Sequence, residues 1–454
     1  MDQVIIIIYL IGILALGIFA GKGIKNINQF SVAGRSFGAW IIFATLSASF
    51  IGGGFSLGNA EKVFLFGIVN IFALWGFSLK EILVSQFIAP KMYKYPEAIS
   101  VGDIMFKNYG KTAKILTGIF SVILCAGILG AQVGAIGYIF NIFLKIPQIY
   151  GILIGCGIVI IYSTIGGMRA VVFTDIVQFI VLAIGIPLTL IFGIHHAGGW
   201  STISSTVPVT HFTFLGTQKT LLQFIVLFLS FLFGETLVPP YVQRLFLAKD
   251  YTHTVKGTLW SGIFSFPFFA ITGLIGIVAL SLKPDLNPNL SMPFVINEVL
   301  PVGLKGIVIA GMISIVMSSA DSFLNAASVA FIHDIITPLK KQEMSSNQKL
   351  LAVRIITIFV GVFAIVFAIK IKSILDILLY SYNFWSPVIL VPLVSAIIGL
   401  KTNKKQFFIG AIAGIAGVII WSFVLKKPLG IDGLIIGLSC NFFAFFTAYF
   451  INKK

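Results

Sequence analysis

Long apolar runs recur along the whole chain and constrain its fold more than any other feature. A helix needs about 20 mostly apolar residues to cross the hydrocarbon core of a bilayer. Since only 10% of the 454 residues are charged and 58% are hydrophobic, a soluble core could not be covered. We therefore predict an all-α polytopic membrane protein, one integral membrane domain over residues 1–454, with about 13 transmembrane helices at 3–22, 38–58, 64–90, 113–143, 149–166, 173–196, 220–243, 257–282, 304–336, 351–369, 376–399, 406–425 and 429–451.

The basic residues indicate the orientation in the membrane. Nothing basic precedes the run 3–22, whereas Lys22 and Lys25 follow it, so we interpret this run as a helix that starts outside and not as a cleaved signal peptide. With that topology 21 of the 31 Lys and Arg residues lie on the cytoplasmic side, nine lie in outer loops, and Lys80 lies within a run. The same distribution accounts for the net charge of +16 without a nucleic-acid partner. The high Ile, Phe and Lys usage is typical of an AT-rich bacterial genome, so we expect a bacterial inner-membrane protein with a cytoplasmic C-terminus.

Two of the runs contain residues that interrupt a helix. The second run carries three glycines at 52–54, and the seventh carries Gly234 and Glu235 followed by Pro239 and Pro240. Unpaired backbone at membrane depth is tolerated only where it lines a cavity or is buried in protein. The breaks lie five runs apart, so they point in opposite directions and predict two inverted repeats, 38–196 and 220–399, with one helix before them and two at 406–451 after them. The alternative is that the glycines only allow close helix packing.

Among the ionisable residues within the runs, the candidates for a transport site are Lys80, Glu81, Asp175, Glu235 and Asp321. In the ninth run Ser318, Asp321 and Ser322 are spaced i, i+3 and i+4, so their oxygens share one helix face and suit a hard cation such as sodium. The alternative is that these hydroxyls bond to carbonyls of their own helix. For Asp175 it is a helix cap near the cytoplasmic surface. Lys80 and Glu81 are adjacent and point about 100 degrees apart, so we expect separate partners for them, and the alternative to a transport role is structural ion pairing with other helices.

Three motifs carry a family resemblance. They are Gly166-Gly167-Met168-Arg169-Ala170-Val171 with Thr174, Asp175 and Gln178; Val242-Gln243-Arg244; and Met317-Ser318-Ser319-Ala320-Asp321-Ser322. Together they resemble the sodium:solute symporter family, which has the leucine-transporter fold, over nearly the whole chain. The resemblance implies a secondary active transporter, not an enzyme, that couples sodium entry to uptake of a small organic solute by alternating access.

The resemblance also implies where sodium, the coupling ion, would bind in one or two sites. The first site would use backbone carbonyls of Ala48, Ile51 and Ile315 with the hydroxyls of Ser318 and Ser319. Some members of the family hold a second sodium nearer the cytoplasm. Its ligands here would be Ser318, Asp321, Ser322 and Asp175.

The stretch 48–54, followed by Gly58-Asn59-Ala60-Glu61, resembles the high-affinity choline transporter branch of the family. A quaternary ammonium prefers aromatic ring faces. The expected substrate site therefore contains the aromatic residues Phe50, Phe55, Trp75, Tyr138, Tyr241 and Trp385, with Gly53 and Glu235 at the two breaks. The resemblance implies a Trp at the position of Phe50, so this chain departs from that branch there. Amino acids, sugars and carboxylates are carried by other members and remain open as substrates.

Two other functions remain open at this point. Asp175 or Asp321 could titrate in place of sodium binding, which would make the protein a proton-coupled symporter. A solute-sensing membrane protein of the same fold is the other candidate. The expected partners are the solute, sodium and the lipid bilayer, and we expect a monomer or a loose dimer.

Overall fold

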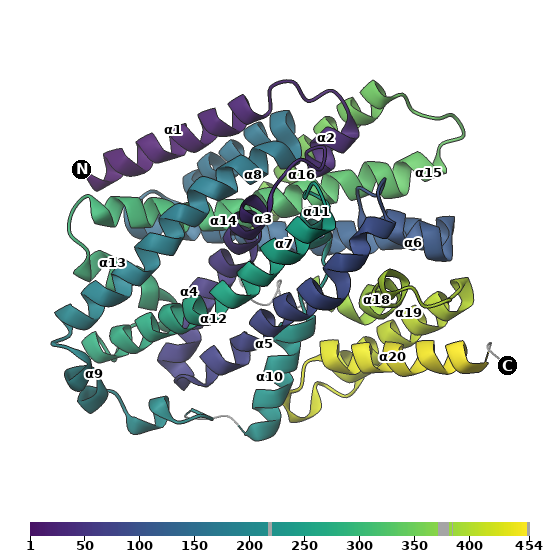
Figure 1. The fold of residues 1–454 in the computed structure, drawn as a ribbon. Coiled ribbons are helices and arrows are strands. Elements are labelled where there is room, and N and C mark those ends of the chain that lie inside the picture. Colours follow the sequence, from purple (N-terminus) through teal and green to yellow (C-terminus); the bar gives the residue numbers. More distant parts are fainter. Residues whose placement is uncertain (217–219, 371–380, 384, 452–454) are drawn as a thin grey trace.

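The chain folds almost entirely into helices (Figure 1). A computed structural model describes residues 1–216, 220–370, 381–383 and 385–451. Within these ranges the α-helices are α1 Asp2–Ala20, α2 Ile27–Val32, α3 Ala39–Leu46, α4 Gly53–Phe66, α5 Val69–Leu83, α6 Val101–Tyr109, α7 Lys111–Leu144, α8 Gln148–His196, α9 Trp200–Thr206, α10 Leu221–Phe233, α11 Pro239–Leu245, α12 Tyr251–Leu282, α13 Ser291–Val299, α14 Leu304–Val329, α15 Thr337–Leu339, α16 Ser346–Lys370, α18 Val391–Ile398, α19 Lys404–Ile419 and α20 Gly433–Ile451. Short π-helices continue several of them, among which η1 Ser47–Gly52, η6 Ala330–Ile336 and η7 Ser386–Leu390 matter below.

The prediction of an all-α membrane protein is confirmed. In the described part of the chain nine helices are long and apolar enough to cross a membrane, or ten if a bent pair counts as one span. The number of thirteen spans and the limits of the two repeats stay predictions, because part of the segment 376–399 lies outside the described residues. The short helices α2, α6, α9 and α13 lie between the predicted runs.

The two predicted runs 149–166 and 173–196 form one helical stretch, α8, which is divided at Gly167. The backbone of Gly167 has φ 46° and ψ −142°, a conformation that favours glycine. Before this kink, Ile160 packs on Gly361 and the carbonyl of Ile165 accepts from Arg354, so this half runs antiparallel to α16. After it, Asp175 meets Ser318 and Gly185 meets Val308, so the second half runs antiparallel to α14.

The two helices with predicted breaks are interrupted in the structure. Residues 39–51 and 55–66 meet at a 46° bend at η1, and α10 is separated from α11 by the non-helical residues 234–238. The amide of Phe37, just before α3, donates to the carbonyl of Leu247, just after α11. At the other end of the pair the amide of Ile68 donates to the carbonyl of His211. The start of one broken helix therefore lies beside the end of the other, and the two run in opposite directions, as predicted.

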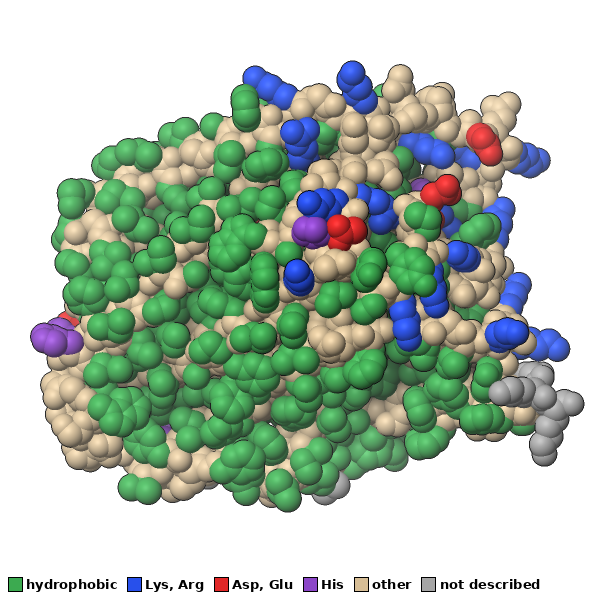
Figure 2. All heavy atoms as spheres, in the orientation of Figure 1, with side chains coloured by type: hydrophobic (Ala, Val, Ile, Leu, Met, Phe, Trp, Pro, Cys, Tyr) green, Lys and Arg blue, Asp and Glu red, His purple; other side chains and the backbone are tan. Residues whose placement is uncertain are grey.

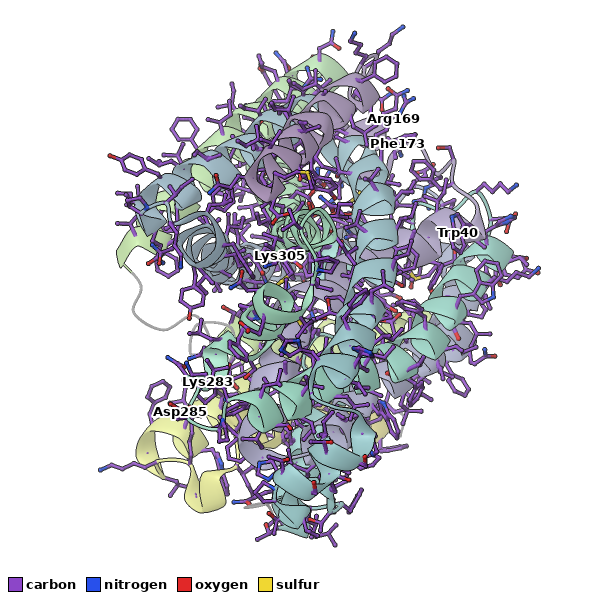
Figure 3. The ribbon with its side chains drawn as sticks, turned by 90° about the vertical axis from the view of Figure 1, so that its left-hand side faces the viewer. Trp40, Arg169, Phe173, Lys283, Asp285 and Lys305 are labelled. Carbon is purple, nitrogen blue, oxygen red and sulfur yellow. The ribbon has the colours of Figure 1, made fainter. Side chains whose placement is uncertain are left out.

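Helix α14 forms the centre of the bundle. In the most apolar 18-residue stretch of this span 94% of the residues are buried, whereas only 28% are buried in the corresponding stretches of α1, α16 and α20. Small residues permit this close packing, since Gly311 lies against Val181 of α8 and Gly306 lies against Asp2. In Figure 3, which looks at the left-hand end of Figure 1, the labelled Lys305 near the start of α14 lies towards the middle of the assembly.

The charged side chains are unevenly distributed over the surface. The N-terminus lies at one end of the molecule and the C-terminus at the other (Figure 1). Figure 2 shows Lys and Arg side chains gathered towards the C-terminal end, while the flank between the two ends is largely hydrophobic. A band of this kind fits a membrane belt with an excess of positive charge on one side.

Candidate functional site

The π-helix η1 packs directly against the middle of α14 at the bend of the first broken helix. The Ser319 hydroxyl donates to the backbone carbonyl of Ser49 over 2.8 Å, and the hydroxyls of Ser49 and Ser318 lie 2.8 Å apart. These side chains are buried within the bundle. The break and the serine-rich face of α14, which the sequence places almost 270 residues apart, therefore form one polar junction.

The residues expected to bind the first sodium all lie at this junction. Ala48 and Ile51 belong to η1, and Ile315 lies one turn before Ser318 and Ser319 on α14. All five residues are buried. The carbonyl of Ile51 accepts a hydrogen bond from the Ser56 hydroxyl over 2.9 Å. The arrangement supplies carbonyl and hydroxyl oxygens, the ligand type that hard cations prefer.

Asp175 lies at the centre of a fully buried polar cluster beside that junction. Its Oδ1 accepts from the Ser318 hydroxyl over 2.5 Å, and its Oδ2 accepts from the Thr45 hydroxyl. A longer bond of 3.3 Å comes from the Ser49 hydroxyl. Asp175 therefore connects α8, the first broken helix and α14, and it does not cap a helix at the surface.

Arg244 supplies the positive charge of this cluster. Its Nη2 lies 3.0 Å from Asp175 Oδ2 and also donates to the hydroxyls of Ser49 at 2.5 Å and Ser322 at 2.6 Å. Its Nε donates to Thr45 Oγ1 over 3.0 Å. Arg244 is one of the basic residues between the predicted runs, and the structure buries its side chain completely (0% exposed). The excess of basic residues on the predicted cytoplasmic side does not depend on it.

Asp321 is buried in the same cluster with fewer donors. Tyr162 donates to its Oδ2 over 2.5 Å, and Ser322 lies 3.0 Å from its Oδ1. The single hydrogen of Ser322 is shared, since its oxygen also lies 2.6 Å from the Ser318 carbonyl. One guanidinium thus faces two carboxylates, and a second cation or a proton would balance the cluster.

Sequence reasoning did not include Thr45, Ser49, Tyr162 and Arg244 among the site residues. Thr45 and Ser49 lie at i and i+4 of the first broken segment and both contact Asp175, so a polar stripe in the second run was a usable signal. Arg244 belongs to a motif noted in the sequence, and Tyr162 lies shortly before another. Tyr162 reaches the cluster from the half of α8 before the kink at Gly167, and Arg244 reaches it from α11, which begins after the second break.

A cavity of ≈ 630 Å³ opens next to the two breaks. Its lining includes Ser49, Phe50, Ser319 and Phe323 from the junction, and Glu235 with Tyr382 from the second break and its neighbour. Glu61, Lys62, Gln223 and Asp432 line it as well. These four residues lie near the predicted outer ends of their helices. The cavity therefore extends from the polar junction of η1 and α14 towards the end of the molecule that lies opposite the cluster of Lys and Arg side chains.

The structure brings some of the expected substrate residues to this cavity. Phe50, Phe55 and Glu235 line it, and Tyr241 is buried with its ring centre 5.4 Å from that of Phe50. The other expected residues do not line it. Trp75 donates its indole N–H to the carbonyl of Phe266, Trp385 donates to the carbonyl of Thr236, and Tyr138 is half-buried on α7. Gly53 begins α4, and its surroundings lie outside the described side chains.

The ammonium of Lys80, a cation of the protein itself, lies among aromatic rings next to the cavity residue Phe50. Lys80 Nζ lies 3.6 Å from the ring centre of Phe77, 4.6 Å from that of Tyr241 and 5.9 Å from that of Phe50. It also lies 2.8 Å from Glu81 Oε1, close enough for an ion pair although the angles do not meet those of a hydrogen bond. Tyr241 donates to the other oxygen of Glu81 over 2.9 Å. The expectation that these two residues find separate partners on other helices is wrong, because Lys80 and Glu81 form a buried ion pair with each other.

A second polar cluster joins α6 to the far end of α14. Asp103, His333 and Asp334 place possible ligand atoms within 4.8 Å of one another. The Lys114 ammonium lies 2.6 Å from Asp103 Oδ1 and 3.7 Å from Asp334 Oδ1, so a cation of the protein itself already serves this cluster. Burial raises the pKa of Asp103, but the His333 hydrogen bond and the charges of His333 and Lys114 outweigh burial and hold that pKa well below its usual value. We interpret this cluster as an interhelical tie.

Comparison with known proteins places this geometry in a family. Residues 30–414 match the model of the sodium:solute symporter family. The chain is 23% identical to sodium/glucose cotransporter 1 of Ovis aries, over 91% of this chain and 70% of that protein. It is 24% identical to high-affinity choline transporter 1 of Drosophila melanogaster, over 84% of this chain and 63% of that protein.

Among solved structures, a sodium-coupled sialic acid symporter in an outward-open state superposes with a TM-score of 0.83 at 21% identity, over 98% of this chain and 96% of the other. This similarity confirms the predicted leucine-transporter-like fold. The family match covers most of the chain and includes both broken helices and the serine-rich face of α14. The protein belongs to the sodium:solute symporter family.

Proposed function

We propose that this protein uses the junction of η1 and α14 to couple sodium entry to the uptake of a small organic solute held in the adjacent cavity. The observation that carries the proposal is the contact of the Ser319 hydroxyl with the Ser49 carbonyl, because it places the hydroxyls of α14 against the irregular backbone of the broken helix. The same residues, Ser49 and Ser319, line the cavity of ≈ 630 Å³. An ion at the junction and a solute in the cavity would therefore share side chains.

In this mechanism sodium binds between the carbonyls of Ala48, Ile51 and Ile315 and the hydroxyls of Ser318 and Ser319. The ion joins the broken helix to α14 and so favours the state in which the cavity is open. The predicted orientation makes that opening extracellular. Entry of each sodium ion supplies about 2.3 kcal/mol per 100 mV of membrane potential, in addition to its concentration gradient. The two repeats then rock about the site and expose it to the cytoplasm.

A second sodium is proposed at Asp321. Its carboxylate, the Ser322 hydroxyl and the nearby pair of Asp175 and Ser318 provide oxygens around a cluster that has one more carboxylate than guanidinium. A monovalent cation there would balance the charge. The stoichiometry of the proposed cycle is then two sodium ions for one solute.

The test compares sodium with potassium at constant ionic strength and measures the melting temperature of the purified protein. A ligand that binds only the folded state raises stability by RT ln(1 + [L]/Kd). We expect a sodium-specific increase in wild type and its loss in Ser319→Ala. Ser328→Ala is the matched control, because Ser328 is equally buried on α14 and its hydroxyl bonds to the Leu324 carbonyl away from the junction. Equal sodium responses of the two variants would contradict the assignment of a sodium site to Ser319.

Proton coupling is the second candidate, and the position of Asp321 is the observation that favours it. A buried carboxylate with two hydroxyl neighbours can hold a proton in place of a cation. The two candidates differ in one measurement. Solute uptake into proteoliposomes driven by a pH gradient in the absence of sodium would support the proton, whereas uptake that requires sodium at every pH supports the proposal above.

A further inference from the structure

Glu235 differs from every other charged residue that lines the cavity. The charged side chains among the lining residues are Glu61, Lys62, Glu235, Lys427 and Asp432. Lys62 pairs with Glu61 at 3.0 Å, and Lys427 pairs with Asp432 at 3.3 Å. Glu235 forms no salt bridge with the described residues, and Lys80, whose charge acts on it from a distance, is paired with Glu81. Among the described lining residues Glu235 is therefore the one carboxylate without a salt bridge of its own.

The two oxygens of Glu235 have different surroundings. Oε1 accepts a hydrogen bond from the Tyr382 hydroxyl, whereas Oε2 is buried and has no hydrogen-bond partner in the described part of the chain. Glu235 as a whole is only 7% exposed. A buried polar atom without a partner costs free energy, and a buried charge costs more. A donor supplied by a bound ligand would remove this cost.

The backbone holds Glu235 in place at the break between α10 and α11. The Ser386 hydroxyl donates to the carbonyls of Phe233 over 2.7 Å and Gly234 over 3.0 Å, and the Trp385 indole donates to that of Thr236 over 3.3 Å. These bonds tie three carbonyls at the break to the neighbouring residues Trp385 and Ser386. The carboxylate is therefore positioned before a solute arrives, which lowers the ordering cost of binding.

The aromatic surroundings argue against a quaternary ammonium at this site. Two of the six rings expected to form a cage, Phe50 and Tyr241, already lie near the Lys80 ammonium, and Phe50 also lies 5.4 Å from the Arg244 guanidinium. A quaternary ammonium has no N–H and could not satisfy Oε2. A protonated primary or secondary amine would supply both the missing donor and the missing charge.

We infer that Glu235 Oε2 binds a protonated N–H amine of the solute, which makes the substrate an amine or amino acid that is not fully N-methylated. This inference rests on the proposed symport function and names its substrate class. A hydroxyl of a neutral polyol could donate to the same oxygen but would leave the carboxylate charge unbalanced.

The experiment uses the full-length purified protein in saturating sodium and pairs of probes that differ only in N-methylation: ethanolamine with choline, glycine with glycine betaine, and L-proline with its N,N-dimethyl form. D-glucose is the neutral probe. Melting temperatures give the dissociation constants. We expect at least one N–H amine to bind wild type about tenfold or more tightly than its quaternary partner, which corresponds to about 1.4 kcal/mol. Tighter binding of a quaternary probe or of glucose, or no response to any amine, would overturn the assignment.

Variants test the residue itself. Glu235→Gln keeps the shape but removes the charge, so its affinity for the preferred amine should fall at least tenfold while its response to sodium is retained. Thr236→Val is the matched control, since the Thr236 hydroxyl is bonded to the Leu232 carbonyl and does not line the cavity. Unchanged amine affinity in Glu235→Gln would refute the role of Glu235. Absence of a sodium response in wild type would instead refute the symport proposal. Failure of the Glu235 assignment and failure of the symport proposal are therefore distinguishable. The probe comparison in wild type decides the substrate class even if Glu235→Gln does not fold.

Discussion

Arg244 Nη2 lies 3.0 Å from Asp175 Oδ2, and both side chains are fully buried in the membrane domain. The two residues come from α11 and from the second half of α8, and the pair therefore joins the two predicted repeats. Because the same guanidinium donates to Ser49 and Ser322, it also links the bend of the first broken helix to α14. The pair therefore supports the scaffold around the proposed ion junction.

Removal of one partner of this pair should destabilise the protein strongly. Arg244→Met leaves Asp175 as an uncompensated buried charge, which costs about 3–5 kcal/mol in comparable pairs. We expect a lower melting temperature and a lower yield of folded protein. The double variant Arg244→Met with Asp175→Asn should recover part of the loss, because it removes both charges. Lys249→Met is the control, since Lys249 is exposed just beyond α11; equal melting temperatures of Arg244→Met and this control would contradict the prediction.

Asp321→Asn should separate the two proposed cations. If a second sodium binds at Asp321, the sodium dependence of the melting temperature should change from a two-site to a one-site curve, because the carboxylate ligand is lost. Titrations at several pH values provide the measurement. Asp334→Asn, which alters a carboxylate on η6 away from the cluster, should retain the two-site curve. A curve that is unchanged in Asp321→Asn, together with a loss of its pH dependence, would show that the residue carries a proton.

The buried pair of Lys80 and Glu81 should behave as a unit. Lys80→Met leaves Glu81 without its cation and should lower the free energy of unfolding by about 3–5 kcal/mol. Glu81→Gln should also destabilise, since the Lys80 ammonium then loses its ion pair and keeps the rings of Phe77, Tyr241 and Phe50. The double variant should be more stable than either single variant, and a double-mutant cycle on melting data measures the coupling. Strictly additive effects would show that the pair has no structural role.

Gly167 should tolerate no side chain. Its φ of 46° disfavours other residues by about 1–3 kcal/mol, and an added Cβ would lie 2.4 Å from the carbonyl oxygen of Phe30. We expect Gly167→Ala to reduce the amount of folded, sodium-responsive protein. Gly157→Ala, on the same α8 but facing open space, is the control and should match wild type. Folded yields that are equal for the two variants would show that the kink is not required.

Much of the fold was predictable because the relevant signals are local. Runs of about 20 apolar residues indicate spans wherever they occur, and glycine and proline interrupt a helix through their own backbone chemistry. The breaks at 52–54 and 234–240 and the opposite directions of the two broken helices were obtained in this way, and the structure confirms them. The ion junction was expected from the spacing of the serines on α14 together with the family resemblance, and its use for sodium stays a prediction.

The sequence by itself determined that the chain crosses a membrane, where two of its helices break, and which face of α14 is polar, because composition, backbone restrictions and the 3.6-residue period act over a few neighbouring residues. Only the tertiary structure decided that Arg244 enters the core to meet Asp175, that Lys80 lies against Tyr241, a ring proposed for a solute, and that one oxygen of Glu235 has no donor among the described residues. The first two relationships join residues 69 and more than 160 positions apart, and the third rests on a missing contact. These relationships depend on which helices pack together and at what depth in the bundle. That arrangement is decided only in the folded protein, where the buried charged groups of all helices must find their partners together.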